Sequence, residues 1–229
     1  MDWGKFTYLL VIIVIGYAPY KILQKMRRQG LNDISLVTAV LLGVWFCILS
    51  WLLFVQAGGA TLHTTKGVAW LFILTTVVWF LAPFLIRKVG VFPKKLVAEK
   101  PSWFVVRFEP RTFYLKYFEV IFQQAKFLFM LFIVLAALPY AAKVFWFTMI
   151  IGFLHFNNIF FLPKKEATIF FILSFPMAVL FGFLILNGFL LLTTSTHLWF
   201  YLVFGGYPWL KRNQGARHIS VLRTLGSIY

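Results

Sequence analysis

The sequence predicts an all-α fold, a bundle of about seven transmembrane helices that makes one domain of residues 1–229. Hydrophobic residues make up 62% of the chain, and its mean hydropathy is +0.87. A soluble domain is usually only about 45–50% apolar. The apolar residues gather into stretches of the length that a helix needs to cross a bilayer, about 17–25 residues. Short basic loops separate these stretches, as in a polytopic membrane protein.

The predicted spans follow one another along the whole chain. In chain order they are 6–22, 34–56, 67–86, 113–137, 143–162, 167–187 and 189–207. The boundary between the last two spans is the least clearly marked. The last two would form one long apolar run without Asn187 and Gly188, and this pair is a typical turn signal.

Basic residues predict the orientation of the spans. Most of the 22 Lys and Arg residues lie in the loops after the first, third and fifth spans and in the tail, 208–229. Lys5, Lys66 and Lys143 lie on the opposite side. Because cytoplasmic loops carry the excess of Lys and Arg, we expect the N-terminus outside and the C-terminus in the cytoplasm. The proline-broken, aromatic and basic segment 87–112 is expected to lie on the cytoplasmic leaflet as an interfacial loop.

The net charge indicates which partners are expected, and the cysteine content indicates which covalent and metal sites are possible. A net charge of +16 would indicate nucleic acid for a soluble protein, but here the basic loops favour anionic lipid headgroups at the cytoplasmic face. No nucleic-acid partner is expected. Cys47 is the single cysteine, which excludes an intramolecular disulfide and a cysteine-based metal site. We expect no cofactor and no metal, and we expect the protein in a bacterial-type plasma membrane.

Three ionisable residues lie inside predicted spans and form the candidate catalytic set. Glu119, His155 and His197 come from the fourth, fifth and seventh spans. Each lies about 7–10 residues from the cytoplasmic end of its span, which places all three at a depth of roughly 10–15 Å. Ionisable groups inside a bilayer usually face the bundle interior or a water-filled cavity, and they mark functional sites.

The fourth span also carries a polar stripe. Lys116, Glu119, Gln123 and Lys126 follow helical spacing, so they share one face that should look into the bundle. A structural interpretation stays open, in which Gln123 and Gln124 hydrogen-bond between helices and Lys126 neutralises Glu119. Lys116 is expected to extend its ammonium to the membrane surface under either interpretation.

Three segments resemble the motifs of the CAAX protease and bacteriocin-processing family of intramembrane endopeptidases. Segment 118–124 (Phe-Glu-Val-Ile-Phe-Gln-Gln) is similar to the first motif, Glu-Glu-x-x-x-Arg, with Phe and Gln at two of its positions. Segment 151–158 (Ile-Gly-Phe-Leu-His-Phe-Asn-Asn) is similar to the second, Phe-x-x-x-His followed by Asn. Segment 197–201 (His-Leu-Trp-Phe-Tyr) is similar to the third, His-x-x-x-Asn, with Tyr in the last place. The likeness covers about residues 112–205.

The resemblance implies a peptidase that cleaves a peptide presented from the cytoplasmic side. Glu119 would activate water as a general base, and His155 or Asn158 would donate to the developing oxyanion. His197 would hold the water or carry a proton. Three further residues, Gln123, Lys126 and Tyr201, would support this set.

Two other functions remain open from the sequence. Because Phe118 and Gln123 replace motif residues, the chain could be a catalytically inactive relative that binds a membrane partner or serves as a subunit of a larger complex. It could also be a small proton-coupled carrier that uses Lys126, Glu119 and the two histidines as a relay.

Overall fold

The structure is a computed structural model of the chain, and it describes residues 2–28, 35–57, 65–89, 110–156 and 164–210. These residues form helices and contain no strand, which confirms the predicted all-helical fold. The helices are α1 (Trp3–Arg28), α2 (Leu36–Gln56), α3 (Lys66–Val89), α4 (Pro110–Phe129), α5 (Tyr140–Phe156), α6 (Lys164–Leu186) and α7 (Leu190–Leu210). A π-helical segment, η1 (Met130–Val134), continues α4.

Three of these helices are long and apolar enough to cross a membrane, namely Leu36–Gln56, Lys66–Leu85 and Phe113–Val134. The described parts of the other helices include shorter apolar stretches, Trp3–Pro19, Tyr140–Phe156, Phe171–Leu186 and Leu190–Val203. The molecule is therefore a helical protein compatible with a membrane. Seven passes and their orientation remain predictions.

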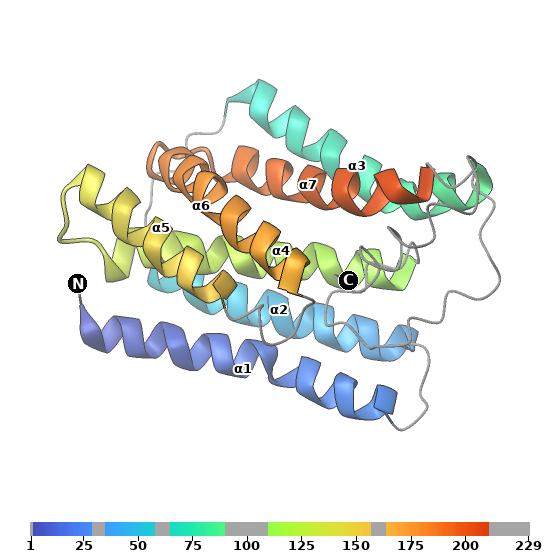
Figure 1. Cartoon of the computed structure of the whole chain (residues 1–229), viewed down its shortest axis with the longest axis horizontal. Coiled ribbons are helices and arrows are strands. Elements are labelled where there is room, and N and C mark those ends of the chain that lie inside the picture. The colour runs from blue at the N-terminus through green and yellow to red at the C-terminus, as the bar shows by residue number, and fades with distance from the viewer. Residues whose placement is uncertain (1, 29–34, 58–64, 90–109, 157–163, 211–229) are drawn as a thin grey trace.

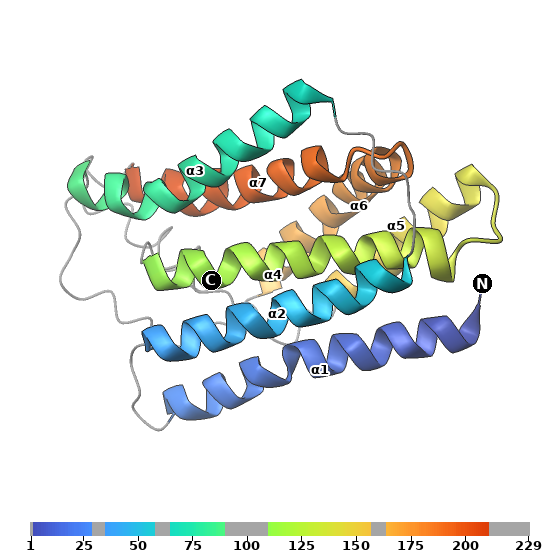
Figure 2. The same ribbon diagram turned by 180° about the vertical axis from the view of Figure 1, so that it is seen from behind.

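Successive helices run back and forth along the long axis of the molecule (Figure 1 and Figure 2). Neighbours in the sequence are not always the closest neighbours in space. The most extensive packing joins α2 to α4, α5 to α6, and α3 to α7. Helices α2 and α4 run in the same direction, whereas α5 and α6 form an antiparallel pair (Figure 1).

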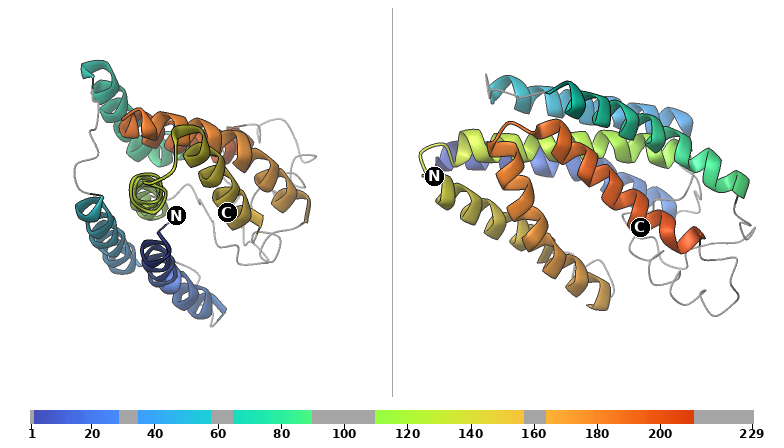
Figure 3. Two further views of the ribbon diagram at one scale, coloured as in Figure 1. Left: turned by 90° about the vertical axis from the view of Figure 1, so that its left-hand side faces the viewer. Right: turned by 90° about the horizontal axis from the view of Figure 1, so that it is seen from above.

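Helix α4 is the central element of the bundle. Seen along the long axis, it has α1 and α2 on one side and α3 and α7 on the other, with α5 and α6 on its flank (Figure 3). Burial agrees with this position, because 72% of the apolar window of α4 is enclosed, against 33% for α2 and 22% for α3. A polar residue on α4 therefore meets other helices rather than lipid.

Aromatic rings and two close-packed glycines set the distances between α4 and its neighbours. The fully buried ring of Phe122 stacks on Phe46 of α2, with centroids 5.4 Å apart. Gly16 of α1 and Gly43 of α2 face rings on α4, and a Cβ at either position would lie less than 3.0 Å from a ring carbon. Small residues of this kind let helix backbones approach closely within membranes.

A proline and a glycine in the sequence account for a bend in α1 and for the turn between α6 and α7. Helix α1 bends partway along its length (Figure 1), and the proline inside it, Pro19, removes a backbone hydrogen bond there. Gly188 takes a φ of 84°, a left-handed conformation that suits glycine, and it turns the chain between α6 and α7. The predicted break in the chain at Asn187 and Gly188 is thus confirmed as a break between two helices. The amide of Asp2 donates to the carbonyl oxygen of Val134 at 3.1 Å, at the end of the π-helical segment.

Candidate functional site

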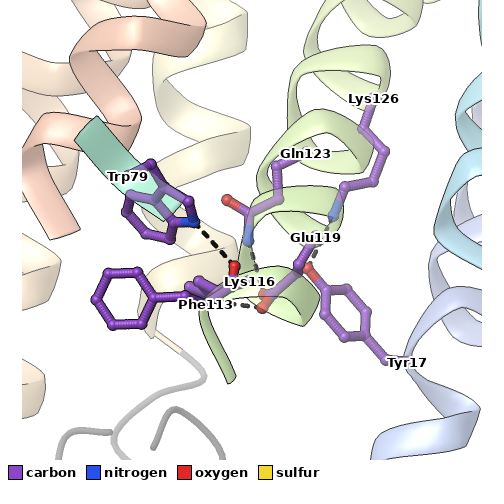
Figure 4. A network of polar contacts seen from close by, with 7 residues as sticks. All are labelled: Tyr17, Trp79, Phe113, Lys116, Glu119, Gln123 and Lys126. Atoms are coloured by element: carbon purple, nitrogen blue, oxygen red, sulfur yellow. Dashed lines mark hydrogen bonds and ion pairs between the residues drawn. The ribbon is translucent and has the colours of Figure 1, made fainter. Parts of the chain in front are cut away.

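A buried ion pair lies at the centre of the polar stripe on α4. Lys116 Nζ donates to Glu119 Oε2 at 3.0 Å, and the two side chains are 5% and 2% exposed. The spacing of three residues brings both groups to one helical face. Gln123, one turn further along, donates from Nε2 to Glu119 Oε1 at 2.9 Å. Both carboxylate oxygens of Glu119 therefore accept a hydrogen bond from the same helix (Figure 4).

Two tyrosines from other helices border this pair. Tyr17 of α1 and Tyr201 of α7 lie close enough to interact with the Glu119 carboxylate and with the Gln123 side chain. The Lys116 ammonium also lies 4.2 Å from the centroid of the Tyr201 ring, in a cation–π contact. The carboxylate is thus enclosed by donors and aromatic rings from three helices.

Lys126 is held on the side of α4 that faces α1. Its Nζ donates to the hydroxyl oxygen of Tyr17 at 2.8 Å. The ammonium also lies 4.6 Å from the ring centroid of Tyr17 and 4.7 Å from that of Phe122. Only 7% of Lys126 is exposed. In Figure 4 its side chain extends along α4 towards the hydroxyl of Tyr17, which is drawn beside Glu119.

His197 meets α4 on the opposite flank. A hydrogen bond of 2.9 Å joins Gln124 Nε2 to His197 Nδ1, between α4 and α7. The imidazole stacks on Tyr201 with centroids 5.2 Å apart, and it lies 5.3 Å from the ring of Phe181 on α6. The interhelical role expected for Gln124 is confirmed by this bond.

His155 is anchored to its own helix. Its Nδ1 donates to the carbonyl oxygen of Ile151 at 2.9 Å. The imidazole is close enough to interact electrostatically with Lys126 and with His197. Among the described residues, no direct hydrogen bond joins Glu119 to either histidine.

The structure therefore gathers six of the seven residues proposed from the sequence around α4, and the seventh cannot be placed. Those gathered are Glu119, Gln123, Lys126, His155, His197 and Tyr201. Asn158 lies outside the described residues, as do the greater part of the interfacial segment 87–112 and the basic residues of the tail.

One expectation about the lysines is wrong. Lys116 does not extend to the membrane surface, because it is 4% exposed and pairs with Glu119. Lys116 makes the direct ion pair with Glu119, whereas Lys126 bonds the phenol of Tyr17 and interacts with Glu119 electrostatically. The spacing of three residues between Lys116 and Glu119 would have been enough to predict that these two side chains pair. Tyr17 was missed, since nothing in an apolar first helix shows that it meets α4.

The chemistry open to this arrangement follows from its contacts. The carboxylate of Glu119 accepts one hydrogen bond at each oxygen, and one of the two donors is an ammonium, which makes these bonds charge-assisted. Rings and hydroxyls surround two ammonium groups. Within the part of the chain that the structure describes, no three His, Cys, Asp or Glu side chains are grouped as metal ligands. Hydrogen bonds from the polar residues of α4 join it to α1 at Tyr17 and to α7 at His197.

Comparison with known proteins gives no match of this chain to a family model, to a curated protein or to a solved structure. The resemblance to the CAAX protease and bacteriocin-processing family remains a prediction that depends on the three short motifs.

Proposed function

We propose that this chain is a multi-pass membrane protein without hydrolytic activity, in which the polar network on α4 holds the helices together and forms a binding centre. This corresponds to the inactive relative of the peptidases, a subunit or partner-binding protein of a membrane complex. The observation that carries the proposal is the pairing of Glu119 with Lys116 and Gln123. Each oxygen accepts a bond from α4, one of them from an ammonium, and this is the arrangement of a structural ion pair, although each oxygen keeps a further acceptor site.

A hydrolysis assay tests the proposal. The full chain is reconstituted in lipid vesicles and mixed with a fluorogenic peptide library, next to a Glu119→Gln variant. The expected result is no cleavage above that of empty vesicles for either protein. Cleavage by the wild type that falls by about 10²-fold or more in Glu119→Gln would overturn the proposal, because general-base catalysis typically contributes 10²–10⁴.

The intramembrane peptidase remains the second candidate, favoured by one specific observation. Polar residues of α4, α5 and α7 face one another inside the bundle, and His197 lies within electrostatic reach of His155. These are the helices whose segments resemble the three family motifs. In this candidate Lys116 would orient Glu119, and the base would become free only when a substrate displaces the lysine. The same hydrolysis assay decides between the two.

We also propose seven passes, with the N-terminus outside and the basic loops in the cytoplasm. The support is the excess of Lys and Arg in alternate loops together with the alternating direction of the helices (Figure 1). Cysteines placed at positions 63 and 100 of a Cys47→Ser protein should react with a membrane-impermeant maleimide from opposite sides. Labelling of both positions from outside intact cells would refute this topology.

A further inference from the structure

Two histidines from different helices are each held by one ring nitrogen. His155 of α5 donates from Nδ1 to the carbonyl oxygen of Ile151 at 2.9 Å. Nδ1 of His197 on α7 is bonded to Nε2 of Gln124 on α4, also at 2.9 Å. The two rings are close enough to interact electrostatically. Within the described ranges, the second nitrogen of each ring, Nε2, has no hydrogen bond.

These two bonds require opposite tautomers of the histidines. A carbonyl oxygen only accepts, so the proton of His155 is on Nδ1. An amide nitrogen only donates, so Nδ1 of His197 accepts and the ring proton is on Nε2. The bond made by one ring nitrogen decides in this way what the other nitrogen offers. In the neutral rings, Nε2 of His155 is therefore an acceptor and Nε2 of His197 is a donor.

The charges around the two rings exclude a cation as the ligand. Lys126 interacts electrostatically with both histidines, and Lys116 does so with His197. Glu119 is the one buried carboxylate of the described residues, and it is already paired with Lys116. A metal ion or an organic cation would add to an excess of positive charge, which like charges oppose.

Both unused nitrogens are accessible to a small molecule. Other hydrogen-bonding atoms of the described residues are fully enclosed without a partner, but Nε2 of neither histidine is among them. Both rings are partly exposed, in contrast to the side chain of Glu119, which is 2% exposed. The rings of Tyr201 and Phe181 flank His197, with centroids 5.2 Å and 5.3 Å away. Polar nitrogens thus lie next to apolar surface.

We propose that His155 and His197 bind the hydroxyl group of a neutral alcohol that has an apolar body. A hydroxyl both donates and accepts, so it matches one acceptor nitrogen and one donor nitrogen, whereas a carboxylate or an ether only accepts. The inference rests on the proposed function, because it names the class of ligand of the binding centre. The alcohol can come from water or from the bilayer, and the rings beside His197 favour an alcohol dissolved in the bilayer.

NMR of 15N-labelled histidine tests the inference, because it reports the tautomer and the hydrogen bonding of each ring nitrogen. The full chain is placed in nanodiscs, and the variants His155→Phe and His197→Phe assign the signals. The proton is expected on Nδ1 of His155 and on Nε2 of His197. Titration with 1-octanol should shift both Nε2 signals in a saturable manner, whereas octane, which has no hydroxyl, should shift neither.

Two further compounds make the test specific for a hydroxyl and for its source. The ether 1-methoxyoctane accepts but cannot donate, so it should shift Nε2 of His197 and leave Nε2 of His155 unchanged. Ethanol at the same concentrations separates the two sources of the alcohol. A shift equal to that with 1-octanol would identify a water-soluble ligand, and no shift would identify one dissolved in the bilayer.

The two variants also measure what each histidine contributes. Either His155→Phe or His197→Phe should weaken the apparent affinity for 1-octanol by about 5–10-fold, read from the remaining histidine, since one hydrogen bond is lost. Phe153→Leu is the matched control, because this exposed side chain lies two residues from His155, and its affinity should equal that of the wild type. If a histidine variant does not fold, the comparison of the compounds on the wild type decides.

Three results would overturn the inference. The first is a proton on the same nitrogen in both histidines. The second is a response to 1-octanol no larger than that to octane, which would mean that water alone serves the two nitrogens. The third is an unchanged affinity in both histidine variants. None of them bears on hydrolysis, and peptide cleavage by the same preparation would instead refute the proposed function while leaving the NMR titrations interpretable.

Discussion

Gly16 is the position where one added methyl group should disturb the helix packing around the polar centre. A Cβ at Gly16 would lie 2.6 Å from Cε1 and 2.7 Å from Cζ of Phe122. Carbon atoms pack at about 3.5–4.0 Å, so the ring would have to move by about 1 Å. Phe122 has no free space for this, since it is fully buried, stacked on Phe46 and in contact with Lys126.

The expected change in the free energy of unfolding follows from two opposing effects of Gly16→Ala. Overpacking a tight core costs about 1–3 kcal/mol. The gain in helix propensity from glycine to alanine offsets up to about 1 kcal/mol of this. Gly67→Ala is the matched control, because it lies in a helix with no atom within 4 Å of the added Cβ. The difference between the two substitutions therefore isolates the packing cost, and we expect it to be about 1–3 kcal/mol.

The assay is reversible unfolding of the two variants and the wild type in the same detergent, followed by circular dichroism. Gly16→Ala should unfold more easily than Gly67→Ala by the stated amount. Equal stability of the two variants would refute the reasoning, since it would show that α1 and α4 are not packed as closely as the structure places them.

Two further predictions concern the N-terminal turn of α1 and the contact between α3 and α7. The carboxylate of Asp2 accepts the backbone amide of Lys5 at 3.1 Å, and this hydrogen bond is the main cause that holds the pKa of Asp2 below its ordinary value. Its contribution to stability should be fully present above the ordinary pKa of aspartate and be lost as the pH falls through the lower, folded-state pKa. Amide exchange in the first turn of α1 should show this loss, and Asp2→Asn should abolish the pH dependence. Thr75→Val removes the acceptor of Trp199 Nε1 at 3.1 Å, and it should cost about 0.6–1.7 kcal/mol in the same unfolding assay, the range of interhelical hydrogen bonds in membranes. An unchanged midpoint would show that this bond does not join the two helices.

The helices could be predicted from the sequence because their signals are local. Long apolar stretches give the spans, and Asn187 with Gly188 gives the turn between the last two, where a left-handed φ is needed. The polar stripe of α4 followed from helical spacing alone. These features depend on residues that are close together in the chain.

The partners of the stripe could not be predicted, since they depend on tertiary packing. Tyr17 is 109 residues from Lys126 in the chain, and no periodicity connects them. Lys116 was expected at the membrane surface because it is close to the start of its span, but Tyr201 of α7 covers it there. Hydropathy places a residue at a depth in the membrane, whereas only the fold decides which side chain it meets.

A double-mutant cycle on Lys116 and Glu119 tests the central claim most directly. The claim is that Glu119 belongs to a structural ion pair and is not a free base. Breaking a buried pair by removing one partner costs about 3–5 kcal/mol, because the other charge is left buried, whereas replacing both partners is often neutral. Lys116→Met and Glu119→Gln should therefore each destabilise the protein, and the double variant should recover most of the loss.

Asp2 and Lys5 provide the matched control for this cycle. They form an ion pair with the same three-residue spacing at 3.4 Å, but their side chains are 46% and 54% exposed. Exposed pairs contribute about 0.2–1 kcal/mol. The account predicts a coupling energy between Lys116 and Glu119 well above that of this control. Equal and small coupling in both pairs, with additive effects of the single changes, would contradict it and return Glu119 to the role of a free catalytic base.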